Sequence, residues 1–146
     1  MEKKNFLEIT ARYAETDMMG IIHHSVYPVW FEAARTEFIK MTGTSYTELE
    51  KKGVMLPLAS LECKYIHPVH YEDKVTIETT VRKLSFAKIE FAYRVILDGQ
   101  VMAEGSTVHG FVSSETFRPL SLKKVMPELF DMIMSAVTDG GETDGA

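Results

Sequence analysis

The sequence has little of what several protein classes depend on. It contains one cysteine, Cys63, so no disulfide can form within the chain, and a reducing compartment is expected. No stretch reaches the roughly 18 apolar residues of a membrane-spanning helix, and the opening MEKKNFLEI has no apolar run of signal-peptide length. With one cysteine and no carboxylate cluster of ligand spacing, a metal site is not expected either. These absences predict a cytoplasmic protein without a membrane span.

Positive charge is also scarce. The chain has 16 Lys and Arg against 21 Asp and Glu, a formal net charge of −5. A nucleic-acid-binding domain usually presents a basic face, so a nucleic-acid partner is not expected. The composition, 45% hydrophobic and 25% charged, is that of an ordinary globular protein, and 146 residues suit one domain.

The spacing of apolar residues predicts a single α+β domain over residues 1–137. Alternation predicts strands over 5–13, 58–66, 75–81, 89–97 and 101–111, the last two joined by a turn at Asp98-Gly99. Helical spacing predicts helices over 26–41, 45–52 and 122–136, the first unusually aromatic and with Ser25 as its N-cap. We expect the last four strands to form an antiparallel meander. Residues 138–146 have nothing to bury and are expected to be disordered.

The stretch before the long helix combines an acid, a glycine and two histidines. Backbone N–H groups at a helix start lack intrahelical partners, and the helix dipole adds partial positive charge there. Gly20 allows a tight turn and the close approach of a ligand, and Asp17 supplies a carboxylate that can act as nucleophile or general base. Together these features suit carbonyl chemistry. The alternative interpretation is that Asp17 and Gly20 only form a turn, and that His23 and His24 are ordinary surface residues.

These residues resemble a known family. The pattern Tyr13-x-x-x-Asp17-x-x-Gly20-x-x-x-His24-x-x-Tyr27, followed by an aromatic helix, is similar to the 4-hydroxybenzoyl-CoA thioesterase-like branch of the acyl-CoA thioesterases. The resemblance continues through YIHPVHYED (65–73) and is strongest to the subgroup associated with the Tol–Pal envelope system. It implies a hotdog fold, in which a five-stranded antiparallel sheet wraps a long central helix. It also implies active sites at the interface of a homodimer formed edge to edge.

The resemblance assigns roles to the motif. Asp17 becomes the catalytic carboxylate, either as a nucleophile or as a base that activates water. The backbone N–H of His24 polarises the thioester carbonyl, and the His24 imidazole and Tyr13 phenol orient Asp17 or the water. Gly20, His23 and Tyr27 help to form the oxyanion and substrate-positioning region. Position 23 is often aromatic in the family, so His23 here suggests a more polar pocket wall.

The resemblance also implies contacts to CoA, whose head group is phosphorylated. Five of the predicted contacts lie around the turn that connects two long strands, and the sixth lies near the end of the last predicted strand: Arg82, Lys83, Ser85, Phe86, Lys88 and Arg118. The alternative interpretation of these cations is that they are solvated turn charges.

The implied activity is hydrolysis of an acyl- or aroyl-CoA thioester to the acid and CoA, without a metal or redox cofactor. Three alternatives stay open at this point: hydrolysis of thioesters on an acyl carrier protein, dehydration of hydroxyacyl thioesters, and a non-catalytic acyl-CoA-binding module. The dehydratase alternative lacks a clear His–Glu pair, and an intact Asp17 argues against the binding module. The assembly is expected to be a homodimer or a tetramer.

Overall fold

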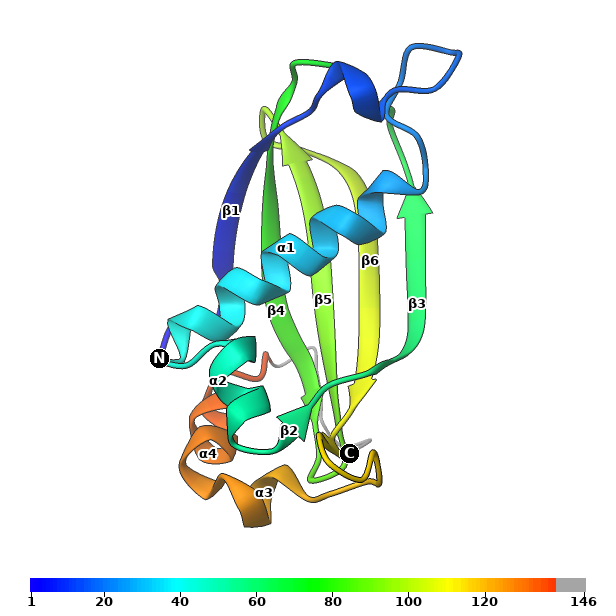
Figure 1. Cartoon of the computed structure of the whole chain (residues 1–146). Coiled ribbons are helices and arrows are strands. Elements are labelled where there is room, and N and C mark those ends of the chain that lie inside the picture. The colour runs from blue at the N-terminus through cyan, green and yellow to red at the C-terminus, as the bar shows by residue number, and fades with distance from the viewer. Residues whose placement is uncertain (139–146) are drawn as a thin grey trace.

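In the computed structural model, which describes residues 1–138, a curved antiparallel sheet wraps one long helix (Figure 1). Five strands form the sheet: β1 (Asn5–Thr10), β3 (Leu58–Tyr65), β4 (Lys74–Leu84), β5 (Lys88–Leu97) and β6 (Gln100–Gly110). The helix α1 (Val26–Met41) crosses the concave face of this sheet. The arrangement is the hotdog fold and confirms the expected α+β class.

The order of strands in the sheet differs from the predicted meander. It is β1-β4-β5-β6-β3, so β4, β5 and β6 are consecutive neighbours but β3 lies at the far edge beside β6. The N-terminal strand β1 takes the place beside β4 that a meander would have given to β3. The predicted Asp98-Gly99 turn is present, with both residues at positive φ, as a tight two-residue hairpin requires.

The aromatic stripe of α1 explains why the helix packs across the sheet. Phe31 stacks on Tyr93 with ring centroids 4.4 Å apart, and Phe38 meets Phe91 edge-on at 5.8 Å. A Cβ atom at Gly105 of β6 would collide with the Phe31 ring, so only glycine lets the helix come this close. This packing fixes the direction in which the N-terminal end of α1 points.

Several element boundaries need correction. The first strand ends at Thr10, and Tyr13 instead begins a short 3₁₀ turn (Tyr13–Glu15), because the chain leaves the sheet after β1. The predicted helix over 122–136 is two helices, α3 (Leu122–Val125) and α4 (Pro127–Ser135), since Pro127 cannot donate a backbone hydrogen bond. The short second helix, α2, spans Tyr46–Lys51. A small sheet of β2 (Val54–Met55) and β7 (Val112–Ser113) was not predicted.

The predicted C-terminal tail falls mostly outside the described residues. Its first residue, Thr138, is described and donates its N–H to the Val81 carbonyl at 3.1 Å, beyond the point where β1 stops pairing with β4. Residues 139–146 lie outside the part of the chain that the structure describes.

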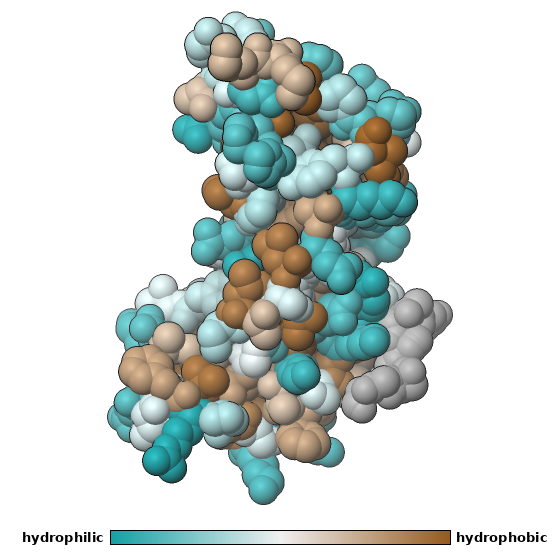
Figure 2. Space-filling view, turned by 90° about the vertical axis from the view of Figure 1, so that its right-hand side faces the viewer, coloured by the Kyte–Doolittle hydropathy of each residue, from teal (hydrophilic) through white to brown (hydrophobic). Residues whose placement is uncertain are grey.

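The edge strand β3 is paired on one side only. Among residues 1–138 it bonds to β6, and no strand covers its outer edge. Leu58, Leu61 and Tyr65 are 50%, 37% and 49% exposed. Figure 2 looks onto the side of the molecule that carries β3, and hydrophobic side chains gather near the middle of that face.

No helix within 1–138 has both the length and the apolar character needed to cross a bilayer. The same residues contain no group of three or more His, Cys, Asp or Glu side chains arranged to hold a metal ion.

Candidate active site

The motif loop projects from one end of the sheet, between the 3₁₀ turn and α1 (Figure 1). Thr16 pairs with Ile22 across the loop, and Ile21 pairs with His70 of the segment that follows β3. The Ile22 N–H also donates to the Val69 carbonyl at 2.8 Å. The loop is therefore a short, laterally supported hairpin whose tip carries Asp17 and Gly20.

Asp17 shapes this tip and still leaves one oxygen available. Its Oδ1 accepts the Met19 N–H at 2.8 Å, and its backbone bonds to Ile21 and Gly20 close the turn at 2.8 and 3.0 Å. Gly20 has φ of +81°, so the turn needs glycine, while the space around it is open. The interpretation of these residues as a turn is thus correct. It does not exclude catalysis, because Oδ2 accepts no hydrogen bond from residues 1–138.

The short segment that leads into α1 leaves one backbone N–H without a partner among the described residues. The N–H of His23 donates to the Glu15 carbonyl at 2.8 Å, that of Ser25 to His23 Nδ1 at 3.1 Å, and that of Val26 to the His23 carbonyl at 3.0 Å. Between Ile22 and Val26, only the His24 N–H donates to no described residue. It lies at the positive end of a 16-residue helix, so it is suited to meet a developing negative charge.

The helix start has no side-chain cap of the expected kind. Ser25 occupies the predicted N-cap position, but its side chain makes no capping hydrogen bond. The His23 imidazole instead holds the residue before the helix: its Nδ1 accepts the Ser25 N–H and lies 2.8 Å from Ser25 Oγ. His23 and His24 also stack, with ring centroids 4.1 Å apart. The adjacent histidines are therefore structural parts of the helix start.

The two tyrosines of the motif have different surroundings. Tyr13 is 75% exposed, packs edge-on against Tyr71 at 5.5 Å, and makes no hydrogen bond to Asp17. Tyr27 is 3% exposed and lies in the core between Trp30 and Tyr65. Burial raises the pKa of Tyr27 to about 12. Tyr27 thus supports the helix start from beneath, whereas Tyr13 faces solvent beside the loop.

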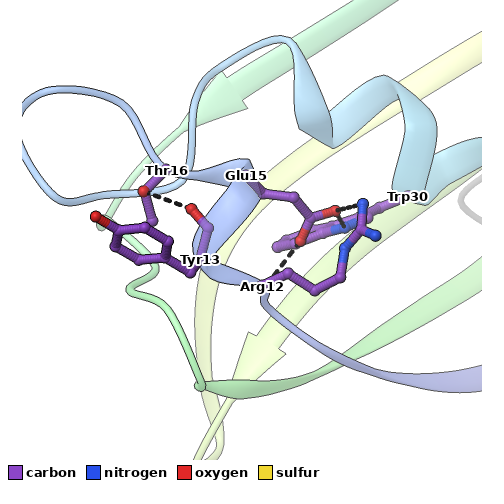
Figure 3. Close-up of polar contacts among 5 residues, drawn as sticks. All are labelled: Arg12, Tyr13, Glu15, Thr16 and Trp30. Atoms are coloured by element: carbon purple, nitrogen blue, oxygen red, sulfur yellow. Dashed lines mark hydrogen bonds and ion pairs between the residues drawn. The ribbon is translucent and has the colours of Figure 1, made fainter.

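Glu15 is a participant that the sequence interpretation missed. Its carboxylate accepts the Arg12 N–H at 2.8 Å, pairs with the Arg12 guanidinium at 3.3 Å, and accepts the Trp30 indole N–H at 3.3 Å. Figure 3 shows Glu15 directed toward Trp30 and Tyr13 directed away from it. Because the Glu15 carbonyl also holds the His23 N–H, Glu15 ties the motif loop to α1. The three-residue spacing of Arg12 and Glu15 could have suggested their ion pair. The bond from Trp30 to Glu15 could not have been predicted in the same way, because 15 residues separate the two.

Tyr65 is the second residue that was missed. It stands at the end of β3, and its hydroxyl donates to the His24 carbonyl at 2.9 Å. Its ring meets Tyr27 edge-on at 5.0 Å. The sequence carries no local signal for this contact, because 41 residues separate the two partners.

The predicted CoA contacts lie elsewhere. Lys83, Ser85 and Lys88 border one cavity of about 330 Å³ at the β4–β5 hairpin. Arg82 borders a different cavity, on the outer face of the sheet, and pairs with Glu90 at 3.2 Å. Phe86 is 62% exposed at the hairpin tip, and Arg118 is exposed on the turn after β7. The hairpin and this turn lie at the end of the sheet opposite the motif loop (Figure 1), so one chain does not bring these residues to Asp17.

Comparisons with known proteins identify the family and support the fold. Residues 11–134 match the family model described as the thioesterase-like superfamily. The chain is 35% identical over 122 residues to the "Putative acyl-CoA thioesterase YneP" of Bacillus subtilis, covering 83% of this chain and 88% of that protein. It is 25% identical over 119 residues to the acyl-CoA thioesterase YbgC of Haemophilus influenzae, covering 81% and 88%. The crystal structure of a DHNA-CoA thioesterase from Staphylococcus aureus superposes with a TM-score of 0.86 at 33% identity, covering 96% and 97%.

Proposed function

The chain belongs to the thioesterase-like superfamily and is a thioester hydrolase, and we propose that it cleaves acyl- or aroyl-CoA thioesters to the free acid and CoA. One observation carries the proposal: within residues 1–138, a single loop presents a carboxylate with one unbonded oxygen and leads into α1 through His24, whose N–H also has no partner. Relatives named as acyl-CoA and DHNA-CoA thioesterases support the CoA form of the substrate.

In the proposed reaction, Asp17 works on the thioester carbonyl carbon. In the nucleophilic route, Asp17 Oδ2 attacks this carbon, the C–S bond breaks, CoA leaves as the thiolate, and water then hydrolyses the mixed anhydride. In the general-base route, Asp17 takes a proton from water as the water oxygen attacks the carbonyl carbon. The C–S bond then breaks, and CoA leaves as the thiolate and takes up the proton from Asp17. Both routes need a fixed carboxylate, which the bond from Met19 to Oδ1 supports.

Both routes also place negative charge on the carbonyl oxygen, and we assign its stabilisation to the His24 N–H. A donor at the positive end of a long helix stabilises an oxyanion, and loss of a comparable donor lowers kcat by about 10²–10³-fold. We keep Tyr13 and the His24 imidazole as candidates for orienting the attacking group, and Gly20, His23 and Tyr27 as the supporting region.

The separation of the predicted CoA contacts from Asp17 supports a site shared between two copies. If two β3 edges pair antiparallel about a twofold axis, the hairpin end of one copy lies beside the motif loop of the other. The unpaired edge and the exposed apolar side chains of β3 favour this pairing. Lys83, Lys88 and Arg118 of one copy would then contact CoA bound at Asp17 of the other, with Arg82, Ser85 and Phe86 nearby.

Two narrower assignments stay predictions. The first is membership of the Tol–Pal-associated subgroup, which YbgC represents. YbgC is 25% identical to this chain, less than the 35% identity of YneP, so the comparisons do not single out this subgroup. The second is a cytoplasmic location. Neither changes the proposed reaction.

Thiol release from a panel of CoA thioesters tests the proposal. The panel spans short to long aliphatic chains and benzoyl and hydroxybenzoyl forms, and a carrier-protein thioester is assayed beside it. We expect Asp17→Asn to lower kcat by about 10²–10⁴-fold while the melting temperature stays near that of the wild type. Asp98→Asn is the matched control, because it removes the same charge at a hairpin turn whose residues have no part in the site.

Near wild-type turnover of Asp17→Asn would contradict the role of Asp17. Activity on the carrier-protein thioester alone would replace CoA as the substrate carrier. A folded wild-type protein that released no thiol from any substrate would contradict the proposed function.

A further inference from the structure

The peptide unit between His24 and Ser25 is held at both of its polar atoms by side chains. The Tyr65 hydroxyl donates to the His24 carbonyl at 2.9 Å, and the Ser25 N–H donates to His23 Nδ1 at 3.1 Å. The preceding peptide unit, which carries the His24 N–H, is fixed through its carbonyl, since the His23 oxygen accepts the Val26 N–H at 3.0 Å. All these groups are therefore bonded except the His24 N–H itself.

We infer that Tyr65 is a positioning residue for the reaction, because its hydroxyl fixes the helix-start peptide so that the His24 N–H faces the thioester oxygen. The inference rests on the proposed function and assigns to the site a residue from the edge strand. Tyr65 acts through the backbone of His24 and not on the substrate.

The surroundings of Tyr65 suit this role. Its backbone lies in the sheet, paired with Ala103 of β6, so the position of its ring is set independently of the motif loop. The ring meets Tyr27 at an interplanar angle of 88°, and Tyr27 is itself buried in the first turn of α1. Partial burial, with the neighbouring Cys63 thiol, raises the pKa of Tyr65 to about 12, so the hydroxyl keeps its proton over the range of enzyme assays.

Removing this hydroxyl should affect the transition state more than substrate binding. Without the hydroxyl, the His24 carbonyl has no partner among residues 1–138, and its peptide unit is held only through the Ser25 N–H, so its orientation varies more. The direction of the neighbouring His24 N–H then varies, and an oxyanion donor is effective only when it points at the developing charge. The CoA contacts are unchanged, so KM should change little.

The test compares Tyr65→Phe with Tyr71→Phe. Both substitutions keep the ring and remove one phenol hydroxyl at the same end of the molecule, and the two tyrosines are 49% and 48% exposed. The Tyr71 hydroxyl makes no hydrogen bond to a described residue, so Tyr71→Phe should match the wild type. For Tyr65→Phe we expect kcat to fall about tenfold, the equivalent of one lost hydrogen bond, with KM within about twofold. Exchange of the Ser25 amide hydrogen, followed by NMR, should become faster in Tyr65→Phe alone.

The outcomes separate the inference from the function on which it rests. If Tyr65→Phe has wild-type kcat and Ser25 exchange while Asp17→Asn is inactive, the positioning role is wrong and the proposed function stands. A raised KM with unchanged kcat would mean that Tyr65 contacts substrate, which also overturns the inference. If the wild type releases no thiol from any substrate, both the proposed function and the inference fail.

Discussion

The two ends of the five-stranded sheet use their charged side chains differently. At the motif-loop end, carboxylates accept hydrogen bonds from their own loops: Asp17 from Met19, Asp73 from His70, and Glu15 from Arg12. At the hairpin end, Lys83, Lys88 and Arg118 form no ion pair with any residue in 1–138. One end thus uses its charges to fix the backbone, whereas the other leaves cations free for a ligand.

We propose that this difference separates the chemical step from the binding of CoA. A reaction at a carbonyl needs a carboxylate and an N–H held in fixed positions, and we assign both to the motif loop. A phosphorylated tail needs cations that are not already paired with carboxylates of the protein. Strand β4, with 11 residues, spans about 35 Å between the two ends, so the two halves of the proposed site meet only if two copies combine.

A charge placed on the exposed apolar side of β3 should have the largest effect. Leu61→Glu puts a carboxylate where the proposed copies meet, and the cost of burying it should separate them. We expect the mass in solution to fall to that of one chain and activity to fall by about a hundredfold, since each site loses the other copy's contribution. Light scattering after size exclusion and thiol release measure the two effects.

Lys64→Glu is the control for this variant. Lys64 is on the same strand, one residue from Cys63 and Tyr65, so its side chain points to the opposite face of the sheet. Lys64→Glu should therefore leave both the mass in solution and the rate of thiol release near those of the wild type. A monomeric Leu61→Glu protein with full activity would show that each chain holds a complete site.

A smaller loss is expected when the motif loop is loosened from α1. Glu15→Gln keeps the size of the side chain but removes the charge that Arg12 and Trp30 share, and bonds to charged groups are the stronger ones. We expect kcat to fall about tenfold with KM nearly unchanged, as measured by steady-state thiol release.

Glu48→Gln serves as its control, because Glu48 is an exposed residue of α2 that pairs only with Lys51 on its own helix. A rise in KM in Glu15→Gln, with kcat retained, would place Glu15 in substrate binding and contradict its positioning role.

The elements that depend on local spacing were predictable, and those that depend on distant contacts were not. The stripe through Trp30 and Phe38 identified α1 with its observed bounds, because a helix needs only its own periodicity. The place of β3 at the edge was not predictable from spacing, since its neighbour in the sheet is chosen by the whole fold.

The same distinction holds within the site. Asp17 and Gly20 were predicted as site residues from one short loop and from the family resemblance, and the structure confirms the turn that they form. Tyr65 was missed because its partner is the backbone carbonyl of His24. Every residue has such a carbonyl, so the sequence does not show which one a tyrosine contacts. The expected cap by the Ser25 side chain is absent, and the His23 imidazole instead accepts the Ser25 N–H just before the helix.

The smallest effect is expected at the hairpin end, where binding alone should suffer. In the double variant Lys83→Ala/Lys88→Ala, KM for acyl-CoA should rise about fivefold with kcat unchanged, because both residues border one cavity and neither approaches Asp17 within a chain. Added salt should reduce the difference in KM between the variant and the wild type, since screening weakens the attraction between the lysines and the phosphates of CoA. A fall in kcat with constant KM would contradict the division between the two ends.

The double variant also offers a direct test of whether the site is shared. Asp17→Asn and the lysine double variant are mixed in equal amounts, allowed to exchange subunits, and assayed below KM. If Asp17 of one copy works with the lysines of the other, each mixed dimer regains one intact site, and the mixture should become about threefold more active than its unmixed halves. If both belong to one chain's site, every site keeps a defect, and exchange should leave the rate unchanged. The same measurement therefore decides whether Asp17 of one copy and the CoA-binding lysines of the other copy form one site.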